Sequence, residues 1–520
     1  MPVGARLGLS ARPQIVVLGA GINGAAAARE LVLGGCDVTL VDAHDLAYGT
    51  TAYSSRLVHG GLRYLEYGDT ALVRESLAER ERLLRLAPDF VRPLEFRVPT
   101  TSRLGGAAAA AAKFFGRIPK TSEARGAWLV RFGLAWYARL VGRSTMPAPR
   151  QLPRGAAARL GLDRRYRYVA SYYDAQMPFP ERFVVALADD ARRAASELGV
   201  RFRLHTYANL AVRDDRLVVT DELGRDAPCE YRPDAVVNAA GPWLDDVLHR
   251  LGAPGSQMLA GTKGTHLLTY HEGLRRAVGE AALYVEASDG RPVFILPFAA
   301  ATLIGTTDLP FAGDPADATA TDAEIDYLLG LVNDVLPTIG LGRDDLTMHY
   351  AGVRPLPRTA VDVPAAVTRR HAVVERTDLP WPVLSLVGGK LTTCRQLAED
   401  VVGAVAARLP LPRSHTSRER PIPESTVSTP DDGVIRPNVA ETTLARRHVR
   451  QILRGEFVRR LDDLVERRLM LHFAPRLTRA TLDDLAGLLV AEGLLADEAR
   501  TAEVERVVDR LRRHFGRRID

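Results

Sequence analysis

Glycines and one acid near the N-terminus have the types and spacing of a nucleotide-phosphate site. They lie in residues 14–42, which read QIVVLGAGINGAAAARELVLGGCDVTLVD. Gly19 permits a tight turn, Gly21 lets the backbone approach a pyrophosphate, and Gly24 lets a helix pack closely on a strand. Asp42 is placed to accept hydrogen bonds from an adenosine ribose, and its charge would repel a 2′-phosphate. The pattern therefore predicts a site for a dinucleotide whose ribose 2′-hydroxyl is free.

The segments around this motif are expected to position it. Apolar runs at 15–18 and 38–41 predict two buried strands, and the alanine-rich stretch between them predicts a helix that Gly34 and Gly35 end. The first N–H groups of that helix have no partner within it, and the helix dipole makes this end positive, so both attract phosphate. A glycine turn between two such strands, with an acid at the end of the second, is more specific than the glycines alone.

Length and charge set limits on the rest of the chain. With 520 residues, 46% of them hydrophobic, the chain is too long for one core and is expected to form two or three domains. The formal net charge is +6. We interpret this excess as arginine on solvated helices, and the alternatives are an anionic substrate and an anionic membrane face.

Cysteine usage and the lack of long apolar runs exclude several classes of protein. Cys36, Cys229 and Cys394 form no CxxC pair, so we expect a reduced, intracellular protein without a structural metal. Residues 1–13 lack the apolar core of a secretory signal. No run reaches the roughly 18 uncharged apolar residues that a membrane-spanning helix needs. Attachment to a membrane surface is the alternative that this leaves open.

The middle of the chain alternates helical and strand patterns. Helices are predicted at 71–86 and 181–198, and strands at 200–205, 208–213 and 216–220. A further short apolar strand is expected in DAVVNAAGPW, at 234–243. The stretch WLVRFGLAWYARLVG, at 128–142, has apolar residues almost all round the helix. We therefore expect it to be buried in the fold, with a partner or a lipid headgroup layer as the alternative.

The second half begins with short alternating runs and ends in helices. Residues 260–375 alternate apolar and polar positions, which predicts an antiparallel sheet. In residues 382–405 a strand leads to two glycines, and a helix is expected from about Thr392. Residues 410–440 are rich in Pro, Ser, Thr and Arg and read as a linker, whereas 441–516 are helical in pattern.

Several motifs stand in an order that resembles a known family. After the glycine motif come SSRLVHGGLRYLE, NAAGPW, IGTTD, GVRPL and GGKLTT. Together they resemble the FAD-dependent sn-glycerol-3-phosphate dehydrogenases of the aerobic, respiratory kind, within the D-amino-acid-oxidase-like flavoprotein superfamily. The resemblance covers residues 15–407 and, more weakly, the helical tail. The chain departs from the family pattern at Glu181 and Arg182, and its region before the final helices is shorter than expected.

The resemblance implies an α/β fold (α+β overall). We expect a Rossmann-like FAD-binding domain, an antiparallel-sheet substrate domain and a small C-terminal all-α domain. The boundaries that follow are 1–13 for a flexible N-terminus, 14–410 for the oxidoreductase core, 411–440 for the linker and 441–520 for the helical domain. Within the core, segments 14–100, 181–260 and 350–410 would bind FAD, and 101–180 and 261–349 would form the substrate domain.

A small dianionic substrate should be held by cations. The resemblance places this role on Arg63, Arg354, Arg369 and Lys390. Arg354 and Lys390 lie among apolar residues and glycines, where a cation without a partner would be costly. Tyr64 and Thr307 are expected to donate hydrogen bonds to the substrate, and Lys263 to approach the anion.

Oxidation of a secondary alcohol needs a base for the hydroxyl proton while hydride leaves for flavin N5. His59, in the HGG loop, and His266, in KGTH, are the two candidates. The FAD contacts that the resemblance implies are Gly19, Gly21, Gly24, Asp42, Ser54, Ser55, Gly60, Gly61, Gly241, Gly388, Gly389, Leu391, Thr392 and Thr393. The last of these are expected to present helix N–H groups to flavin N1 and O2.

The expected reaction is oxidation of sn-glycerol 3-phosphate to dihydroxyacetone phosphate, with electrons passed to a quinone. The alternatives are an oxidase of the same substrate, a superfamily enzyme that acts on an amino or 2-hydroxy acid, and a non-catalytic flavin-binding protein. We expect a cytoplasmic protein that is peripheral on the inner face of the cell membrane, a homodimer, and no nucleic-acid partner. The arginine-rich tail at 446–468 is interpreted as packed on the catalytic body, with anionic lipid as the alternative partner of its arginines.

Overall fold

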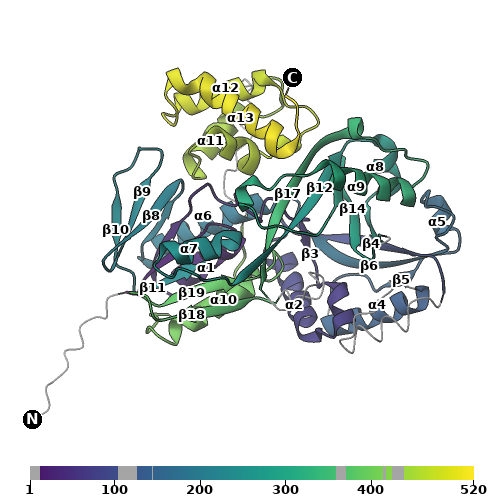
Figure 1. Cartoon of the computed structure of the whole chain (residues 1–520), viewed down its shortest axis with the longest axis horizontal. Helices are drawn as coiled ribbons and strands as arrows, with labels where there is room; N and C mark the ends of the chain where they lie inside the picture. The colour runs from purple at the N-terminus through teal and green to yellow at the C-terminus, as the bar shows by residue number, and fades with distance from the viewer. Residues whose placement is uncertain are drawn as a thin grey trace, which may run out of the picture.

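The computed structural model describes residues 12–103, 126–142, 144–287, 289–358, 370–413, 417–423 and 438–519. The side chains of Arg63, Glu66 and Tyr67 are also outside the description. Two lobes stand side by side, each built on one main sheet, and a group of helices lies above them (Figure 1). The fold is mixed α/β, as the sequence predicts.

The first lobe is a mostly parallel sheet with the strand order β18-β19-β11-β1-β2-β7. The strands are β1 (Gln14–Leu18), β2 (Asp37–Val41), β7 (Phe202–His205), β11 (Ala235–Asn238), β18 (Ala372–Arg376) and β19 (Val383–Val387). Helices α1 (Ile22–Leu33), α6 (Pro180–Leu198), α7 (Leu244–Arg250) and α10 (Cys394–Ala406) belong to this lobe. The alanines of α1 are buried, which lets α6 and α10 pack closely against it.

A small antiparallel sheet extends this lobe. It consists of β8 (Ala208–Arg213), β9 (Arg216–Asp221) and β10 (Cys229–Tyr231). The predicted strands at 200–205, 208–213 and 216–220 agree with these elements to within two residues. Tyr207 lies in the turn between β7 and β8. This turn contacts the loop after β2, because the Tyr207 N–H donates to the carbonyl of His44 at 3.2 Å.

The second lobe is a large mixed sheet with the order β16-β12-β15-β14-β13-β4-β6-β3, to which β17 adds through β12 and β5 through β6. Its strands are β3 (Leu57–Val58), β4 (Arg92–Thr100), β5 (Arg150–Gln151), β6 (Tyr168–Gln176), β12 (Leu259–Thr269), β13 (Ala281–Glu286), β14 (Pro292–Phe298), β15 (Ala301–Gly305), β16 (Leu309–Pro310) and β17 (Leu346–Pro357). Its helices are α2 (Thr70–Leu86), α4 (Ala127–Val141), α5 (Ala156–Arg159), α8 (Glu272–Val278) and α9 (Asp322–Val335), with short turns η1 (Leu62–Tyr67), η2 (Gly241–Trp243), η3 (Pro315–Asp317) and η4 (Arg343–Asp345) in the loops of the two lobes.

The sheets divide the chain differently from the expected segments at three strands. Strands β3 and β4 lie within 14–100 and most of β17 lies within 350–410, both assigned to the FAD-binding part, yet all three strands belong to the larger sheet. The sheet to which a strand belongs depends on the strands that pair with it, and the sequence of a single strand does not identify those partners.

Helix α4 is not buried all round, which corrects the expectation for 128–142. Val130, Leu134 and Tyr137 are buried against the lobe, whereas Trp128 and Phe132 are 57% and 70% exposed. The helix therefore covers the second lobe with one face and presents aromatic side chains on the other.

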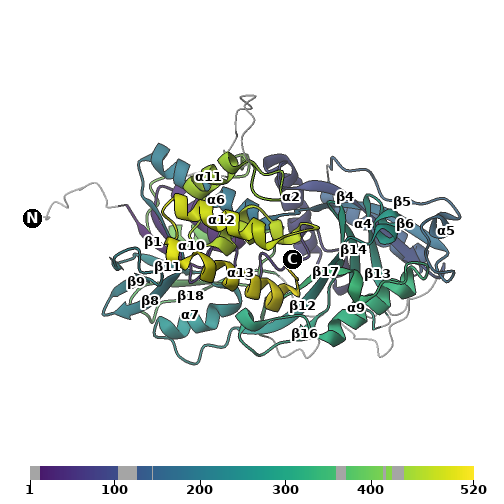
Figure 2. The same ribbon diagram turned by 90° about the horizontal axis from the view of Figure 1, so that it is seen from above.

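The C-terminal domain lies over the first lobe and the junction between the lobes (Figure 2). It consists of α11 (Arg446–Gly455), η6 (Asp463–Arg468), η7 (Leu471–Phe473), α12 (Arg479–Ala491), η8 (Asp497–Ala499) and α13 (Arg500–Phe515). Helix α11 ends at Gly455 and Phe457 has a positive φ of 59°. Leu453, Phe457, Leu461 and Leu464 therefore do not lie on one continuous helix, although each of them packs into the core.

The predicted linker lies partly outside the described residues. Within 417–423, Ile422 is buried in the core of the first lobe and Ser417 accepts a hydrogen bond from Arg395 at 3.1 Å. This part of the linker is thus packed on the core. Among the described residues, no helix is both long and apolar enough to cross a bilayer.

Candidate functional site

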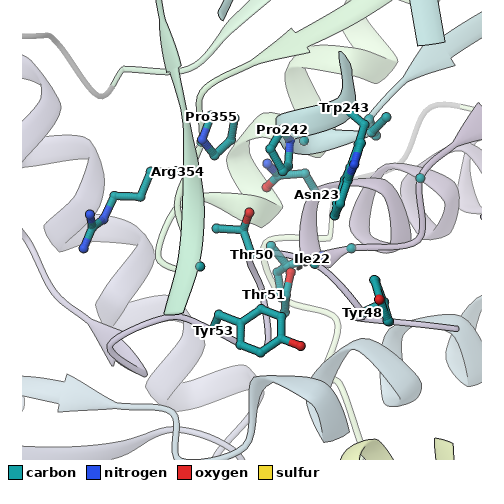
Figure 3. A pocket seen from close by; sticks show the side chains of 18 of the residues that line it. Ile22, Asn23, Tyr48, Thr50, Thr51, Tyr53, Pro242, Trp243, Arg354 and Pro355 are labelled. Atoms are coloured by element: carbon teal, nitrogen blue, oxygen red, sulfur yellow. Dashed lines mark hydrogen bonds between the residues drawn. The ribbon is translucent and has the colours of Figure 1, made fainter. Parts of the chain in front are cut away.

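The two lobes enclose a cavity of about 880 Å³. Its walls come from the carboxyl ends of β1, β2 and β11, the loop at 48–59, strands β12 and β17, and the turn at 388–392. In Figure 3 the side chain of Arg354 points away from the group formed by Ile22, Asn23 and Trp243. The glycine motif and Arg354 therefore occupy different ends of one cavity, which we call the glycine-motif end and the Arg354 end.

Most of the predicted site residues line this cavity. They are Gly19, Gly21, Asp42, Ser54, Ser55, His59, Tyr64, Gly241, His266, Arg354, Gly388, Gly389, Lys390, Leu391 and Thr392. The predicted residues that do not line it are Gly24, Gly60, Gly61, Thr307 and Thr393. Arg369 is outside the described residues, as is the side chain of Arg63.

The glycine motif has the close approaches that its residue types require. A Cβ on Gly24 would lie 1.8 Å from the carbonyl oxygen of Gly19, so the helix can start beside the strand only with glycine here. Gly19 has a φ of +103°, and a Cβ on it would lie 2.5 Å from the carbonyl oxygen of Ala239. The N–H of Ile22, the first residue of α1, donates to Thr51 Oγ1 at 3.1 Å, and both residues line the cavity.

Asp42 is fixed by backbone donors at the end of β2. Its Oδ2 accepts from the N–H of Ala20 at 2.6 Å and its Oδ1 from the N–H of His44 at 2.8 Å. Burial raises the pKa of this carboxyl to about 6. A carboxylate has about four lone-pair sites, so the oxygens retain the capacity to accept from ribose hydroxyls.

Three motifs that are far apart in the sequence meet at the end of the cavity that the glycine motif lines. Asn23, in the glycine motif, donates from Nδ2 to the carbonyl of Gly388 at 3.4 Å. The N–H of His59 donates to Thr392 Oγ1 at 3.1 Å, and the Thr392 hydroxyl donates to the carbonyl of His59 at 3.3 Å. The turn at 388–392 therefore joins the glycine motif to the HGG loop.

This end of the cavity fits FAD. Asn23 Oδ1 is buried and has no hydrogen-bond partner among the described residues, so it is an acceptor that awaits a donor. Gly389 has a φ of +101°, and a Cβ there would lie 2.5 Å from Asn23 Nδ2. Glycine motif, ribose acid and open backbone turn are the parts from which a flavin dinucleotide site is made. The predicted helix at this turn starts slightly later than expected, since α10 begins at Cys394.

Arg354 is held in place by the segment that joins β15 to β16. Its Nη1 lies 3.0 Å from Asp308 Oδ1 and its Nη2 donates to Thr306 Oγ1 at 2.8 Å. Lys390 lies at the same cavity, with Nζ 4.1 Å from the centroid of the Tyr64 ring and 3.4 Å from Ser76 Oγ. Both cations are thus oriented before any anion arrives.

His266 is a neutral residue in a dry corner of the cavity. Its Nε2 lies 2.9 Å from Ser55 Oγ and its ring stacks on Tyr350, with centroids 4.9 Å apart. Burial, with the charges of Arg354 and Arg56, holds the pKa of His266 well below its usual value. His59 lines the cavity from the HGG loop and is only partly buried.

Two residues that were predicted to contact the substrate, Thr307 and Lys263, have the same acidic partner in the structure. Thr307 Oγ1 donates to Glu324 Oε1 at 2.8 Å and accepts from the N–H of Thr265. Lys263 Nζ forms a salt bridge of 2.8 Å with the other oxygen of Glu324. Both side chains thus have Glu324, which caps α9, as a partner, and their contact with substrate stays a prediction.

Several residues at the site were not predicted from the sequence. His44, Tyr48 and Trp243 line the cavity near the ribose acid. Arg56, inside the SSRLVHGG motif, is buried and forms a two-pronged salt bridge with Glu181, at 2.7 and 3.0 Å. Glu181 is thus the partner of a residue in the cofactor loop, which is a role that its position at the start of a helix did not indicate.

Comparisons with known proteins show which family this chain is similar to. A family model described as FAD dependent oxidoreductase matches residues 14–395. A glycerol-3-phosphate dehydrogenase of Synechocystis sp. is 35% identical over 416 residues, which are 76% of this chain and 70% of the relative. A D-erythritol 1-phosphate dehydrogenase of Brucella abortus is 33% identical over 427 residues, 80% and 78% of the two chains.

A solved structure has the same fold over nearly its whole length. It is the glycerol-3-phosphate dehydrogenase from Bacillus halodurans complexed with FAD, with a TM-score of 0.68 and 19% identity over 97% of this chain and 95% of that chain. The cofactor of the present protein is FAD, which the glycine motif, Asp42 and the turn at 388–392 would hold. The chain belongs to the family of FAD-dependent oxidoreductases that includes the glycerol-3-phosphate dehydrogenases.

Proposed function

We propose that this protein oxidises sn-glycerol 3-phosphate to dihydroxyacetone phosphate and passes the electrons to a membrane quinone. The observation that carries the proposal is that Arg354 and Lys390 line the same cavity as the glycine motif and the HGG loop. A phosphate needs such cations, whereas a non-phosphorylated amino or hydroxy acid needs fewer of them. Relatives named for two different polyol phosphates support a phosphorylated alcohol as the substrate class.

Each part of the cavity has a task in this reaction. Arg354 and Lys390 bind the phosphate and so place the secondary alcohol between them and the HGG loop. Bound FAD supplies the acceptor for the hydride that leaves the carbon. His59 takes the hydroxyl proton, because the low pKa of buried His266 makes that residue a weak base. His266 and Ser55 orient the substrate as neutral hydrogen-bonding groups.

The reaction is tested by adding sn-glycerol 3-phosphate to the purified protein in the absence of oxygen. The flavin absorbance is expected to bleach as the alcohol loses a hydride to the flavin and its hydroxyl proton to a base. A ubiquinone analogue is expected to restore the colour. Glycerol without phosphate serves as the matched control and should leave the spectrum unchanged. Bleaching by D-erythritol 1-phosphate alone would transfer the proposal to that substrate. Rapid return of the colour in air without quinone would show an oxidase.

We also propose that α4 forms the membrane contact through which a quinone is reached. Trp128 and Phe132 are the large exposed hydrophobic side chains of the described residues. Arg131 and Arg139 are exposed on the same helix, and the guanidinium of Arg131 lies 5.4 Å from the Trp128 ring. Aromatic side chains among cations suit the headgroup layer of an anionic bilayer.

The arginine-rich tail at 446–468 is a weaker candidate for the membrane contact than α4. Arg446, Arg454 and Arg460 pair with acids of their own domain, namely Asp484, Glu492 and Glu503. Arg467 and Arg468 are buried. The interpretation that the tail packs on the catalytic body therefore has the support of the structure.

Cosedimentation with phosphatidylglycerol vesicles distinguishes the two surfaces. Trp128→Ser with Phe132→Ser is expected to lower the partition coefficient about tenfold or more, since each aromatic loses apolar burial. The matched control is Arg450→Ser with Arg454→Ser on α11, which should have little effect. Binding that depends on the arginine pair and not on the aromatics would place the membrane face on the tail instead.

A further inference from the structure

The loop that follows the ribose acid forms one wall of the FAD end of the cavity. His44, Tyr48, Gly49, Thr50 and Tyr53 all line it. The loop is short of regular structure of its own: it consists of turns between β2 and β3. Some of the contacts that fix its shape come from the two lobes, since the N–H of Ala47 donates to the carbonyl of Ala20 and the Thr50 hydroxyl donates to that of Val353. The C-terminal domain supplies a further set.

The first tie is a buried carboxylate. Asp45 is fully buried and lies three residues after Asp42. Arg468 binds it with both Nη atoms at 2.8 Å, and Arg467 Nε binds it at 2.7 Å. Without these arginines Asp45 would be an anion in a dry environment, so the loop would have to move to bring it to water.

The second tie supports the aromatic wall. The ring of Tyr48 stacks on His44, with centroids 3.9 Å apart. The guanidinium carbon of Arg510, on α13, lies 5.0 Å from the centroid of Tyr48. Arg510 Nη2 also donates to the hydroxyl of Tyr53 at 3.3 Å, and Glu466 holds the same guanidinium at 2.7 and 2.9 Å.

The third tie reaches the loop from its other side. The N–H of Tyr207 donates to the carbonyl of His44, and the Tyr207 hydroxyl donates to Asp463 of the C-terminal domain. The domain also contains the acids that orient its own arginines. Arg467 pairs with Asp462, Asp463 and Glu466. The charges are thus fixed within the domain before they meet the loop.

We propose that the C-terminal helical domain is a clamp on the cofactor loop, so that Arg467, Arg468 and Arg510 determine how tightly FAD is held. These are positioning residues: they act through Asp45, Tyr48 and Tyr53. The proposal concerns the cofactor alone and does not depend on which polyol phosphate is oxidised.

The test is the FAD dissociation constant of deflavinated protein, measured by the quenching of flavin fluorescence as FAD is added back. Arg510→Met is expected to raise it about tenfold or more, because the variant removes the cation and the fork that hold Tyr48 and Tyr53. The matched control is Arg454→Met, whose side chain is 70% exposed and pairs with Glu492 in the same domain. It should bind FAD like the unaltered protein.

A milder variant covers the case in which Arg510→Met does not fold. Tyr207→Phe removes a single hydroxyl and is expected to raise the FAD dissociation constant about threefold. The unfolding temperature of the FAD-free protein, recorded for each variant, separates the two roles of the domain. An unchanged FAD affinity in Tyr207→Phe and in folded Arg510→Met, with a lower unfolding temperature, would show that the domain only stabilises the fold and would overturn the proposal.

Discussion

Arg354→Ala is expected to weaken binding of sn-glycerol 3-phosphate by about 2–4 kcal/mol, which is roughly 30- to 1000-fold. The guanidinium is 18% exposed and is already oriented by Asp308 and Thr306. A charge-assisted pair in such a shielded place loses little entropy on binding and competes weakly with water. The measurement is the substrate concentration that gives half the maximal rate of anaerobic flavin bleaching.

Two further variants make this result specific. Arg354→Lys keeps the charge but loses the two-pronged geometry, so an intermediate loss is expected. Arg343→Ala is the control, since Arg343 belongs to the same lobe but pairs with Asp322 and Asp326 at the surface. FAD content should be unchanged in all three. If Arg354→Ala kept the affinity of the unaltered protein, Arg354 would not be part of the phosphate site.

The glycine motif could be predicted from the sequence because its geometry is local. A strand, a turn, a helix and a second strand follow within residues 14–42, and the structure has them as β1, α1 and β2. Neighbours in sequence decide each step, from the close approach of Gly24 to the backbone donors at Asp42. Periodicity also predicted α2 and α6 to within one residue at either end.

Contacts between distant segments could not be predicted in the same way. Glu324 forms a capping box with Thr321 at the start of α9. The sequence does not reveal that β12 also brings Lys263 and Thr265 to the same carboxylate. The hydrogen bond from Thr307 to Glu324 could not be predicted for the same reason, because it depends on how α9 packs on the sheet.

The composition of the chain does not predict which arginines are buried. We interpreted the basic excess as solvated charge, yet Arg29, Arg56, Arg80 and Arg467 are among the largest fully buried side chains of the described residues. Each has an acid as its partner, and the sequence separation runs from 94 residues for Arg80 and Asp174 to 422 for Arg467 and Asp45. A sequence shows how many cations there are, but the fold decides which of them cross-link the lobes.

The buried pair of Arg56 and Glu181 connects the cofactor loop to the first lobe. Arg56 also donates to the carbonyl of Pro178 at 2.7 Å and stacks over the Phe473 ring at 4.5 Å. Its neighbour Ser55 is the hydrogen-bond partner of His266. Both members of the pair are essentially without exposure, at 1% and 0%.

Glu181→Ala is therefore expected to lower the free energy of unfolding by about 3–5 kcal/mol, because Arg56 is left as a buried cation without its partner. Urea unfolding at saturating FAD measures the loss, with Glu197→Ala, at the exposed end of the same helix, as the control. Adding Arg56→Met to Glu181→Ala removes the stranded charge, so the double variant should be more stable than Glu181→Ala alone. Losses that simply add would contradict this account, since they would show that each side chain stabilises the loop independently of the other.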